Sequence, residues 1–286
     1  MADKNRAERP PLACEITMRA VSGARVVKGE LDMVQTRPLA AGMVTPSLHG
    51  QNIARPEAVR EALSEVLDSI GGRGRDIIAV IPDAAVRILL LDFESLPDKH
   101  EDAEPVVRFR VKKSIPFDLD KAIVSYDSSR GSNGVRVTAA VILRSVLDEY
   151  EAVFRDAGCN PGVVLPSTLA ALGAVDGSRP TMLLKLDGAT SSVAIVDSDQ
   201  LLLFRTMDAG GDVAPERVAE DVYPSLVYFQ DTYGMNVERV LLSGASGSET
   251  LKAALRDQTS ARIEELSAAL PSGARAEAAG AIGALL

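Results

Sequence analysis

The residues with the clearest potential for chemistry are six consecutive ones, Asp187-Gly188-Ala189-Thr190-Ser191-Ser192. The first of them ends an apolar run, and the five after it are small or carry a hydroxyl group. Backbone N–H groups of such a turn can approach a phosphate, because no bulky side chain stands between them. The alternative is an ordinary hairpin with a small, polar tip. The local sequence favours the hairpin, so the rest of the chain must decide.

The turn at Asp187 belongs to a predicted meander of three strands. Short apolar runs occur at 182–186, 193–197 and 201–206, and small or polar residues separate them. Gly210 and Gly211 follow the third run. The turn is therefore the connection between the first two strands of the meander.

A second meander of the same plan is predicted near the N-terminus. Its runs lie at 12–16, 20–28 and 32–37, and this order indicates an internal duplication. In this copy, Thr17-Met18-Arg19 stands where we place Gly188-Ala189-Thr190 of the later copy. The first copy thus lacks the small residues of the second.

Composition excludes several classes of function. The 286 residues carry a formal net charge of -9, which argues against nucleic-acid binding, because a phosphate backbone calls for a basic surface. Two cysteines and two histidines lack the spacing of a metal site, and so few thiols suggest a reducing compartment. No apolar run approaches the roughly 20 residues of a membrane helix. Any membrane association is therefore expected to be indirect.

The remaining pattern predicts an α/β protein with two lobes. Helices are expected at 54–70, 101–114, 146–157, 166–175 and 214–233. Ser145 is expected to cap the helix at 146–157, and Pro224 is expected to start a new segment in the last helix or to kink it. Strands are expected at 76–81, 86–93, 121–126, 134–143, 163–165 and 239–242, with a loop at 127–133. The expected domains are a disordered leader (1–11), a first lobe (12–176) with an insertion near 84–165, a second lobe (181–270) and a C-terminal helix (271–286) that returns to the first lobe.

A family resemblance rests on the order of several short motifs. Residues 114–126, SIPFDLDKAIVSY, resemble the segment of PilM-type pilus assembly proteins in which a helix stops at an Ile-Pro-Phe-Pro-type turn before a strand. Residues 141–158 are similar to the family's strand and its helix ending in Ala-Gly, 186–191 to its second phosphate loop, and 225–230, SLVYFQ, to another of its helices. No one motif is specific, and their order carries the resemblance.

The resemblance implies a two-lobed actin-like (RNase H-like) fold, related to the cell-division protein FtsA, with an inserted SHS2-like subdomain in the first lobe. It further implies a cytoplasmic protein beneath the inner membrane. Such a protein docks the N-terminal cytoplasmic peptide of a PilN-like membrane protein, in a groove of the first lobe near the insertion. It also implies ATP binding with weak or regulated hydrolysis. Self-association stays open.

The resemblance also assigns a candidate nucleotide site, in which Asp187 would hold Mg²⁺ through water. Its residues are Asp187, Gly188, Ala189, Thr190, Ser191, Gly210, Gly211, Gly244, Glu15 and Thr17. Three departures predict that ATP binding is weak or lost. Glu15 and Met18 replace the Asp and Gly of the first phosphate loop, the helix beside the nucleoside looks reduced, and Gly244 stands where two glycines are usual.

Two functional hypotheses follow. The first is a PilM-like adaptor of a pilus assembly platform that binds nucleotide weakly or not at all. The alternative is an active actin-fold ATPase or small-molecule kinase that uses Asp187 together with Asp83. A pair of catalytic carboxylates at Asp83 and Asp92 is a further option, although aspartates at strand ends more often form turns.

Overall fold

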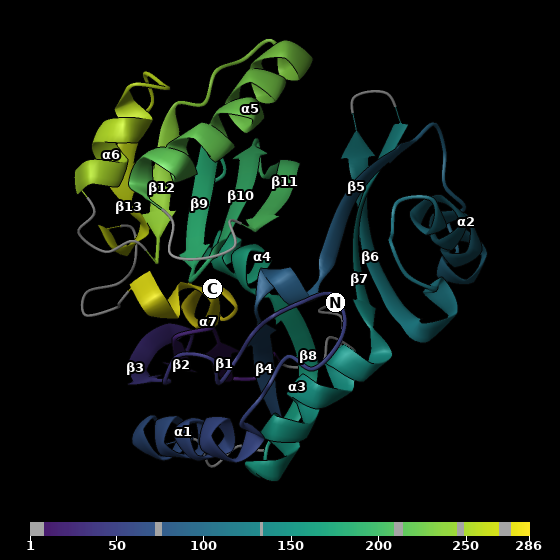
Figure 1. Cartoon of the computed structure of the whole chain (residues 1–286). Helices are drawn as coiled ribbons and strands as arrows, with labels where there is room; N and C mark the ends of the chain where they lie inside the picture. The colour runs from purple at the N-terminus through teal and green to yellow at the C-terminus, as the bar shows by residue number, and fades with distance from the viewer. Residues whose placement is uncertain (1–8, 72–75, 132–133, 209–213, 245–248, 269–275) are drawn as a thin grey trace.

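A computed structural model describes residues 9–71, 76–131, 134–208, 214–244, 249–268 and 276–286. Two five-stranded sheets form two lobes, one above the other, and a three-stranded sheet stands beside them (Figure 1). The two lobes and their mixed α/β content confirm the predicted fold class.

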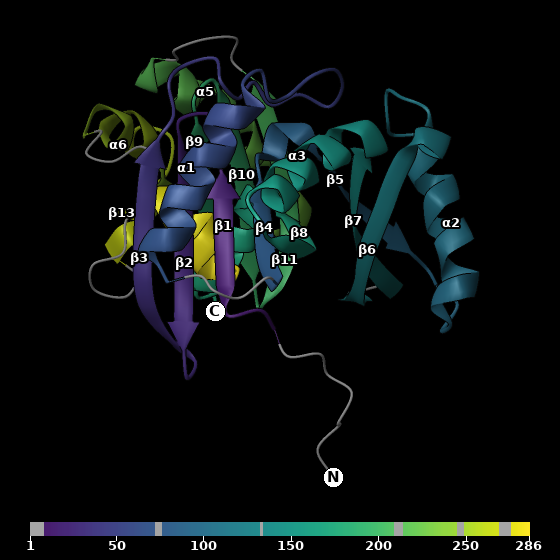
Figure 2. The same cartoon turned by 90° about the horizontal axis from the view of Figure 1, so that it is seen from below.

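The first sheet has the strand order β3-β2-β1-β4-β8. Its strands are β1 (Leu12–Ile16), β2 (Ala20–Val27), β3 (Glu30–Pro38), β4 (Asp76–Ile81) and β8 (Asn160–Pro166). Helices α1 (Pro56–Ser69) and α3 (Arg144–Asp156) cover its outer face (Figure 2). Proline suits the first turn of α1, where an N–H has no helical partner, and Val59, Leu63 and Val66 bury one side of this helix.

The second sheet repeats this plan in the order β11-β10-β9-β12-β13. Its strands are β9 (Thr181–Asp187), β10 (Thr190–Asp197), β11 (Gln200–Asp208), β12 (Arg239–Ser243) and β13 (Arg262–Glu265). Helices α5 (Pro215–Tyr233) and α6 (Glu249–Arg256) cover its outer face (Figure 1). In both sheets the meander is antiparallel and its first strand pairs in parallel with a strand from later in the chain.

The two meanders match residue by residue. A bulge falls between Arg25 and Val26 in the first and between Ile195 and Val196 in the second. Hydroxyl pairs bridge the same strand positions, Ser22 with Thr36 at 3.0 Å and Ser192 with Thr206 at 3.3 Å. The duplication predicted from the sequence is therefore present in detail, and the difference in residue number between matching positions of the two copies is constant.

The three-stranded sheet has the order β5-β7-β6 and packs against one helix. Its elements are β5 (Arg87–Phe93), α2 (His100–Lys112), β6 (Ala122–Gly131) and β7 (Gly134–Leu143). Val107, Val111 and Val137 form its separate small core. The bounds expected for the insertion, 84–165, also include α3 and β8. In the structure, β8 pairs with β4 and α3 packs in the core of the first lobe, so both elements belong to the first lobe. The separate sheet ends at residue 143.

Two short helices of small residues fill the space between the lobes. They are α4 (Ser167–Ala171) and α7 (Ala279–Gly283), and short 3-10 turns extend each of them. A Cβ on Gly173 would collide with the backbone carbonyl of Gly283, so the two segments are in direct backbone contact. Ala13 of the first sheet and Leu183 of the second share their core. The end of the chain thus joins the lobes (Figure 1).

Three local expectations were wrong. Residues 127–131, expected in a loop, continue β6 because the hairpin extends its pairing to Gly131 opposite Gly134. Helix α3 begins at Arg144 with no side-chain cap, so Ser145 lies inside it. Helix α5 continues through Pro224, so the expectation that a new segment starts there was wrong, while the alternative of a kink stays a prediction. The exposed position of Pro224 leaves the freed carbonyl one turn earlier open to water.

Candidate functional site

Glu15 lies at the junction of the lobes and has no exposed surface. It lies in β1, and one of its carboxylate oxygens accepts a hydrogen bond from Lys185 Nζ at 2.7 Å. The same contact makes the two side chains an ion pair. Ser167 Oγ donates to the same oxygen. The N–H groups of Gly280 and Ala281 in α7 donate to the other oxygen at 2.9 and 3.2 Å. Both oxygens are therefore fully occupied by the protein itself.

Lys185 comes from β9 in the other lobe and is 4 % exposed. Burial by itself would lower the pKa of Lys185, but the adjacent Glu15 carboxylate outweighs burial and raises it above the ordinary value. The ammonium therefore stays charged, and the ion pair spans the two lobes. Because a buried charge without its partner is very unfavourable, each side chain holds the other in place.

The tips of the two meanders also touch each other. The N–H of Met18 donates to both carboxylate oxygens of Asp187, at 3.0 and 3.3 Å. The Met18 side chain lies over Gly188, where an added Cβ would come within 2.7 Å of its sulfur. In this arrangement, the amide that could face a phosphate already has a carboxylate as its partner.

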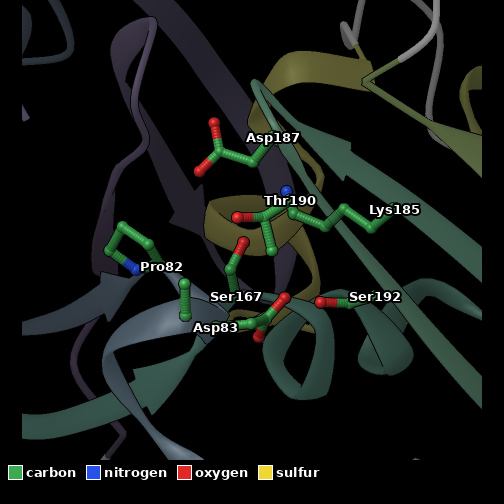
Figure 3. Close-up of a pocket in the computed structure, with 8 residues that line it drawn as sticks. Pro82, Asp83, Ser167, Lys185, Asp187, Thr190 and Ser192 are labelled. Atoms are coloured by element: carbon green, nitrogen blue, oxygen red, sulfur yellow. The ribbon is translucent and has the colours of Figure 1, made fainter. Parts of the chain in front are cut away.

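A small polar cavity lies beside these contacts. Figure 3 shows Asp83, Ser167, Thr190 and Ser192 gathered below Asp187. The cavity measures about 10 Å³, close to the space that one water molecule needs. Its size and its polar lining suit a single bridging water.

Two carboxyl groups line this cavity, so the structure does bring Asp83 and Asp187 together. Asp83 accepts hydrogen bonds from Thr168, at 2.9 Å from the N–H and 2.6 Å from the hydroxyl. Burial raises the pKa of Asp83, and burial raises the pKa of Asp187 to about 6. Asp92 lies elsewhere, bonded to Arg136 at 2.9 Å, so the pairing of Asp83 with Asp92 was wrong.

The other candidate residues of the second meander serve its hairpin. Gly188 and Ala189 form a two-residue turn, in which Gly188 has the left-handed φ of +61°. Thr190 and Ser191, expected in a longer loop, already pair with β9 as part of β10. Gly210 and Gly211 lie outside the residues that the structure describes.

Thr17 and Gly244 have local roles in this structure. Thr17 Oγ1 donates to the Ala20 carbonyl at 3.1 Å and accepts from the Ala20 N–H at 3.0 Å, which closes its own turn. Gly244 has a φ of +78°, and a Cβ there would collide with the Leu186 carbonyl. Neither residue presents a side-chain donor to a phosphate.

The constant offset of the meanders corrects one alignment. Ile16 pairs with Val21 in the first copy as Leu186 pairs with Ser191 in the second. Thr17 therefore matches Asp187 and Met18 matches Gly188, one residue away from the expected alignment. Glu15, which was aligned with Asp187, instead matches the residue two places earlier.

Lys185 is the functional residue that sequence analysis missed. Its signal was present, because a lysine inside the apolar run MLLKL must find a buried partner. In the same way, Glu15 is the charged residue in the apolar run LACEI. Two such residues at matching positions of a repeat would have predicted the pair.

The described residues at the tips of the two meanders do not fit a triphosphate with Mg²⁺ in this arrangement. The first loop donates its Met18 amide to Asp187, and the Met18 side chain covers Gly188. Within the described ranges no group of three or more His, Cys, Asp or Glu residues could hold a metal ion. Glu15 and Lys185 satisfy each other rather than a ligand.

No family model matches the sequence, and no curated protein matches it. Chains of known three-dimensional structure, in contrast, do match this chain. The PilM–PilN type IV pilus biogenesis complex contains a chain that superposes with a TM-score of 0.79 at 17 % identity, over 97 % of each chain. A protein from Bacteroides thetaiotaomicron, with an actin-like ATPase fold and unknown function, gives 0.53 at 14 % identity over 95 % of this chain and 96 % of that one.

The chain has an actin-like ATPase fold. A third similar structure is the cytoplasmic domain of EpsL, an inner-membrane component of the type II secretion system of Vibrio cholerae. It gives a TM-score of 0.53 at 12 % identity, over 86 % of this chain and 93 % of that one. Among the described residues, no helix is long and apolar enough to cross a membrane.

Proposed function

We propose that this protein is a cytoplasmic adaptor of a pilus or secretion assembly platform, and that it works without bound nucleotide. The observation that carries the proposal is the direct closure of the two lobes by Glu15 with Lys185. An actin-like fold closes its lobes around a nucleotide, whereas here two side chains of the chain span the same junction. The similarity to a PilM chain over nearly the whole length supports the assembly role.

The proposed partner is a PilN-like membrane protein, bound through its N-terminal cytoplasmic peptide. A cavity of about 590 Å³ beside the start of the three-stranded sheet supports this proposal, and its walls come from the first lobe and from β11 of the second. Leu48 comes from the loop before α1, Val86 and Ile88 come from the start of β5, and Phe204 closes the other side. This mixture of apolar side chains with a few polar ones is typical of peptide and ligand pockets. We propose that the three-stranded sheet with α2 is the SHS2-like insertion.

The partner is tested with a synthetic peptide that copies the cytoplasmic N-terminus of the PilN-like protein from the same genome. Calorimetric titration is expected to show binding to the full chain. Leu48→Glu places a charge in the cavity and is expected to weaken it, whereas Met33→Glu, on an exposed position of β3, is the matched control. Absence of binding to the wild-type chain would contradict the proposed partner.

Independence from nucleotide is tested by melting the full chain with and without ATP and Mg²⁺. A ligand that binds only the folded state raises its stability by RT ln(1 + [L]/Kd). We expect a change in Tm of less than about 1 °C at millimolar ATP, since binding with a micromolar Kd would raise Tm by several degrees. A rise of that size, abolished by Asp187→Ala, would favour the ATPase alternative.

A further inference from the structure

A groove of about 510 Å³ lies where the three-stranded sheet meets the second lobe, beside the contact of Arg136 with the Tyr233 ring at 5.7 Å. Its two walls are β5 and β11, each the outermost strand of its sheet. No strand within the described ranges pairs with the outer edge of either one. Figure 1 shows β5 and β11 facing each other across this groove. Unpaired strand edges carry free N–H and C=O groups, and these pair readily with another extended chain.

Most of the strand residues that line the groove come from the two edge strands, while Arg136 of β7 and residues of α5 complete the lining. Consecutive residues of β5, from Arg87 to Leu90, line it, as do four consecutive residues of β11, from Leu202 to Arg205. Successive side chains of a strand point to opposite faces of its sheet. A groove that meets all of them must run beside the backbone, which is the position an added strand would take.

The charge of the groove is opposite to that of the whole molecule. Arg87 and Arg205 line opposite walls, and neither has a hydrogen bond or ion pair to any described residue. Arg136 is paired with Asp92 at 2.9 Å, so the two free arginines leave the groove positively charged. The chain as a whole carries a formal net charge of -9. This local excess favours an acidic occupant.

An unsatisfied hydroxyl adds a second observation. Ser225 of α5 lines the groove and is 2 % exposed, and its Oγ has no hydrogen-bond partner among the described residues. A buried polar group without a partner is costly and uncommon, and a ligand can supply the missing bond. Tyr228, one helical turn further on, is 55 % exposed beside it.

We propose that this groove binds an acidic, extended segment of a partner protein as a fourth strand on the free edge of β5. Carboxylates of the segment pair with Arg87 and Arg205, and one of its acceptor groups bonds to Ser225 Oγ. The segment contacts both the three-stranded sheet and the second lobe, which also touch directly where Gln200 Nε2 donates to the Arg130 carbonyl at 3.2 Å. The groove adjoins the cavity proposed for the PilN-like peptide and shares Arg87, Ile88, Phe204 and Arg205 with it. Ser225 and Tyr228 line this groove alone, and the occupant proposed here is defined by its acidic charge rather than by its origin in a PilN-like protein.

The probe is a fluorescein-labelled peptide of alternating glutamate and valine, six residues long, titrated with the full chain and followed by fluorescence anisotropy. The matched peptide with lysine in place of glutamate is expected not to bind. N-methylation of alternate backbone nitrogens removes donors on one edge and is expected to abolish binding. Equal binding of the lysine or the N-methylated peptide would overturn the proposal.

Variants of the chain locate the site. The double change Arg87→Gln and Arg205→Gln is expected to weaken the acidic peptide at least about tenfold, and Arg60→Gln on the exposed side of α1 is the matched control. Ser225→Ala removes only the unpaired hydroxyl, so it is expected to leave Tm unchanged while it weakens binding by about three- to tenfold.

Unchanged affinity in both groove variants would overturn the proposal. So would sedimentation that shows a dimer of the wild-type chain and a monomer of the double arginine variant, because the occupant would then be a second copy. Failure of the PilN-like peptide to bind, together with specific binding of the acidic peptide, would overturn only the proposed function.

Discussion

Glu15 and Lys185 occupy matching positions of two repeated meanders, 170 residues apart, and bond to each other at 2.7 Å across the junction of the lobes. The same offset relates Ser22 to Ser192 and Thr36 to Thr206. The pair therefore lies at the point where the two repeats meet. It joins the two lobes directly through protein side chains.

Removing one partner of this buried pair is expected to be severe. Lys185→Met leaves the Glu15 carboxylate buried without its cation, and we expect a loss of about 3–5 kcal/mol in the free energy of unfolding. The double change Glu15→Gln and Lys185→Met is expected to recover most of that loss, because both charges are gone and the glutamine oxygen still accepts from the Gly280 and Ala281 N–H groups. Urea denaturation monitored by circular dichroism measures both values.

The matched control for this experiment is the exposed pair of Arg37 with Glu65. Arg37→Met is expected to cost about 1 kcal/mol or less, since exposed pairs contribute little. Equal losses for Lys185→Met and Arg37→Met would contradict the assignment of the inter-lobe pair as essential to the fold.

The pH dependence of stability is expected to change in Asp187→Asn. The pKa of Asp187 is about 6 in the folded state, above the ordinary 3.8, because burial disfavours the charged form. The carboxyl therefore contributes stability that is fully present below pH 3.8 and lost as the pH rises through about 6. Asparagine keeps the acceptor for the Met18 N–H but has no charge to bury.

We expect Asp187→Asn to match the wild type near pH 4 and to exceed it by about 2–3 kcal/mol at pH 7. Urea denaturation of both proteins between pH 4 and 7 provides the measurement. Two curves that run parallel over this range would show that Asp187 does not titrate as inferred.

Two glycines allow backbone strain to be separated from a steric clash. Gly234 and Gly244 both have left-handed φ values, of +67° and +78°. A Cβ on Gly234 meets nothing within 4 Å, whereas one on Gly244 meets the Leu186 carbonyl of the neighbouring strand. We expect Gly234→Ala to cost about 1–2 kcal/mol, the price of the left-handed conformation alone, and Gly244→Ala to cost clearly more.

Thermal or urea denaturation of the two alanine variants checks this order. A smaller loss for Gly244→Ala than for Gly234→Ala would mean that the turn after β12 does not press against β9. In that event the contact between these strands would need to be revised.

The two cysteines are expected to be unreactive in the native protein. Cys14 and Cys159 are buried as free thiols, and burial raises the pKa of each. Since the thiolate is the reactive form, a thiol reagent such as DTNB should react slowly with the native chain and rapidly after denaturation. Fast reaction of either thiol under native conditions would contradict its burial.

Much of the fold followed from local patterns. Strands β1 and β4 were predicted with their observed ends, because apolar runs bounded by turn residues mark buried strands well. The end of β6 was missed because Ser128, Ser129 and Arg130 have the composition of a loop, and cross-strand pairing with β7 outweighs that preference. No new helical segment starts at Pro224, because the packing of α5 against the second sheet outweighs the local effect of proline on the helix.

The candidate site was predicted less well. The turn at Asp187 was located correctly, and its nucleotide role stays a prediction. What the sequence did not reveal was the partner of each polar group, because Met18 meets Asp187 and Glu15 meets Lys185 only through the packing of the lobes. A residue-by-residue comparison of the repeats would have revealed the second pair, since it depends only on their offset.

The offset of the repeats also bears on the history of the protein. Two identical halves would assemble around a twofold axis, and a residue on that axis would face its own copy. Two buried glutamates or two buried lysines facing each other would repel strongly, so the Glu15–Lys185 contact could not exist in a symmetric ancestor. This ion pair requires that the two repeats differ at this position, so it arose after their sequences began to diverge. The junction of the lobes therefore records a step at which the two repeats ceased to be equivalent.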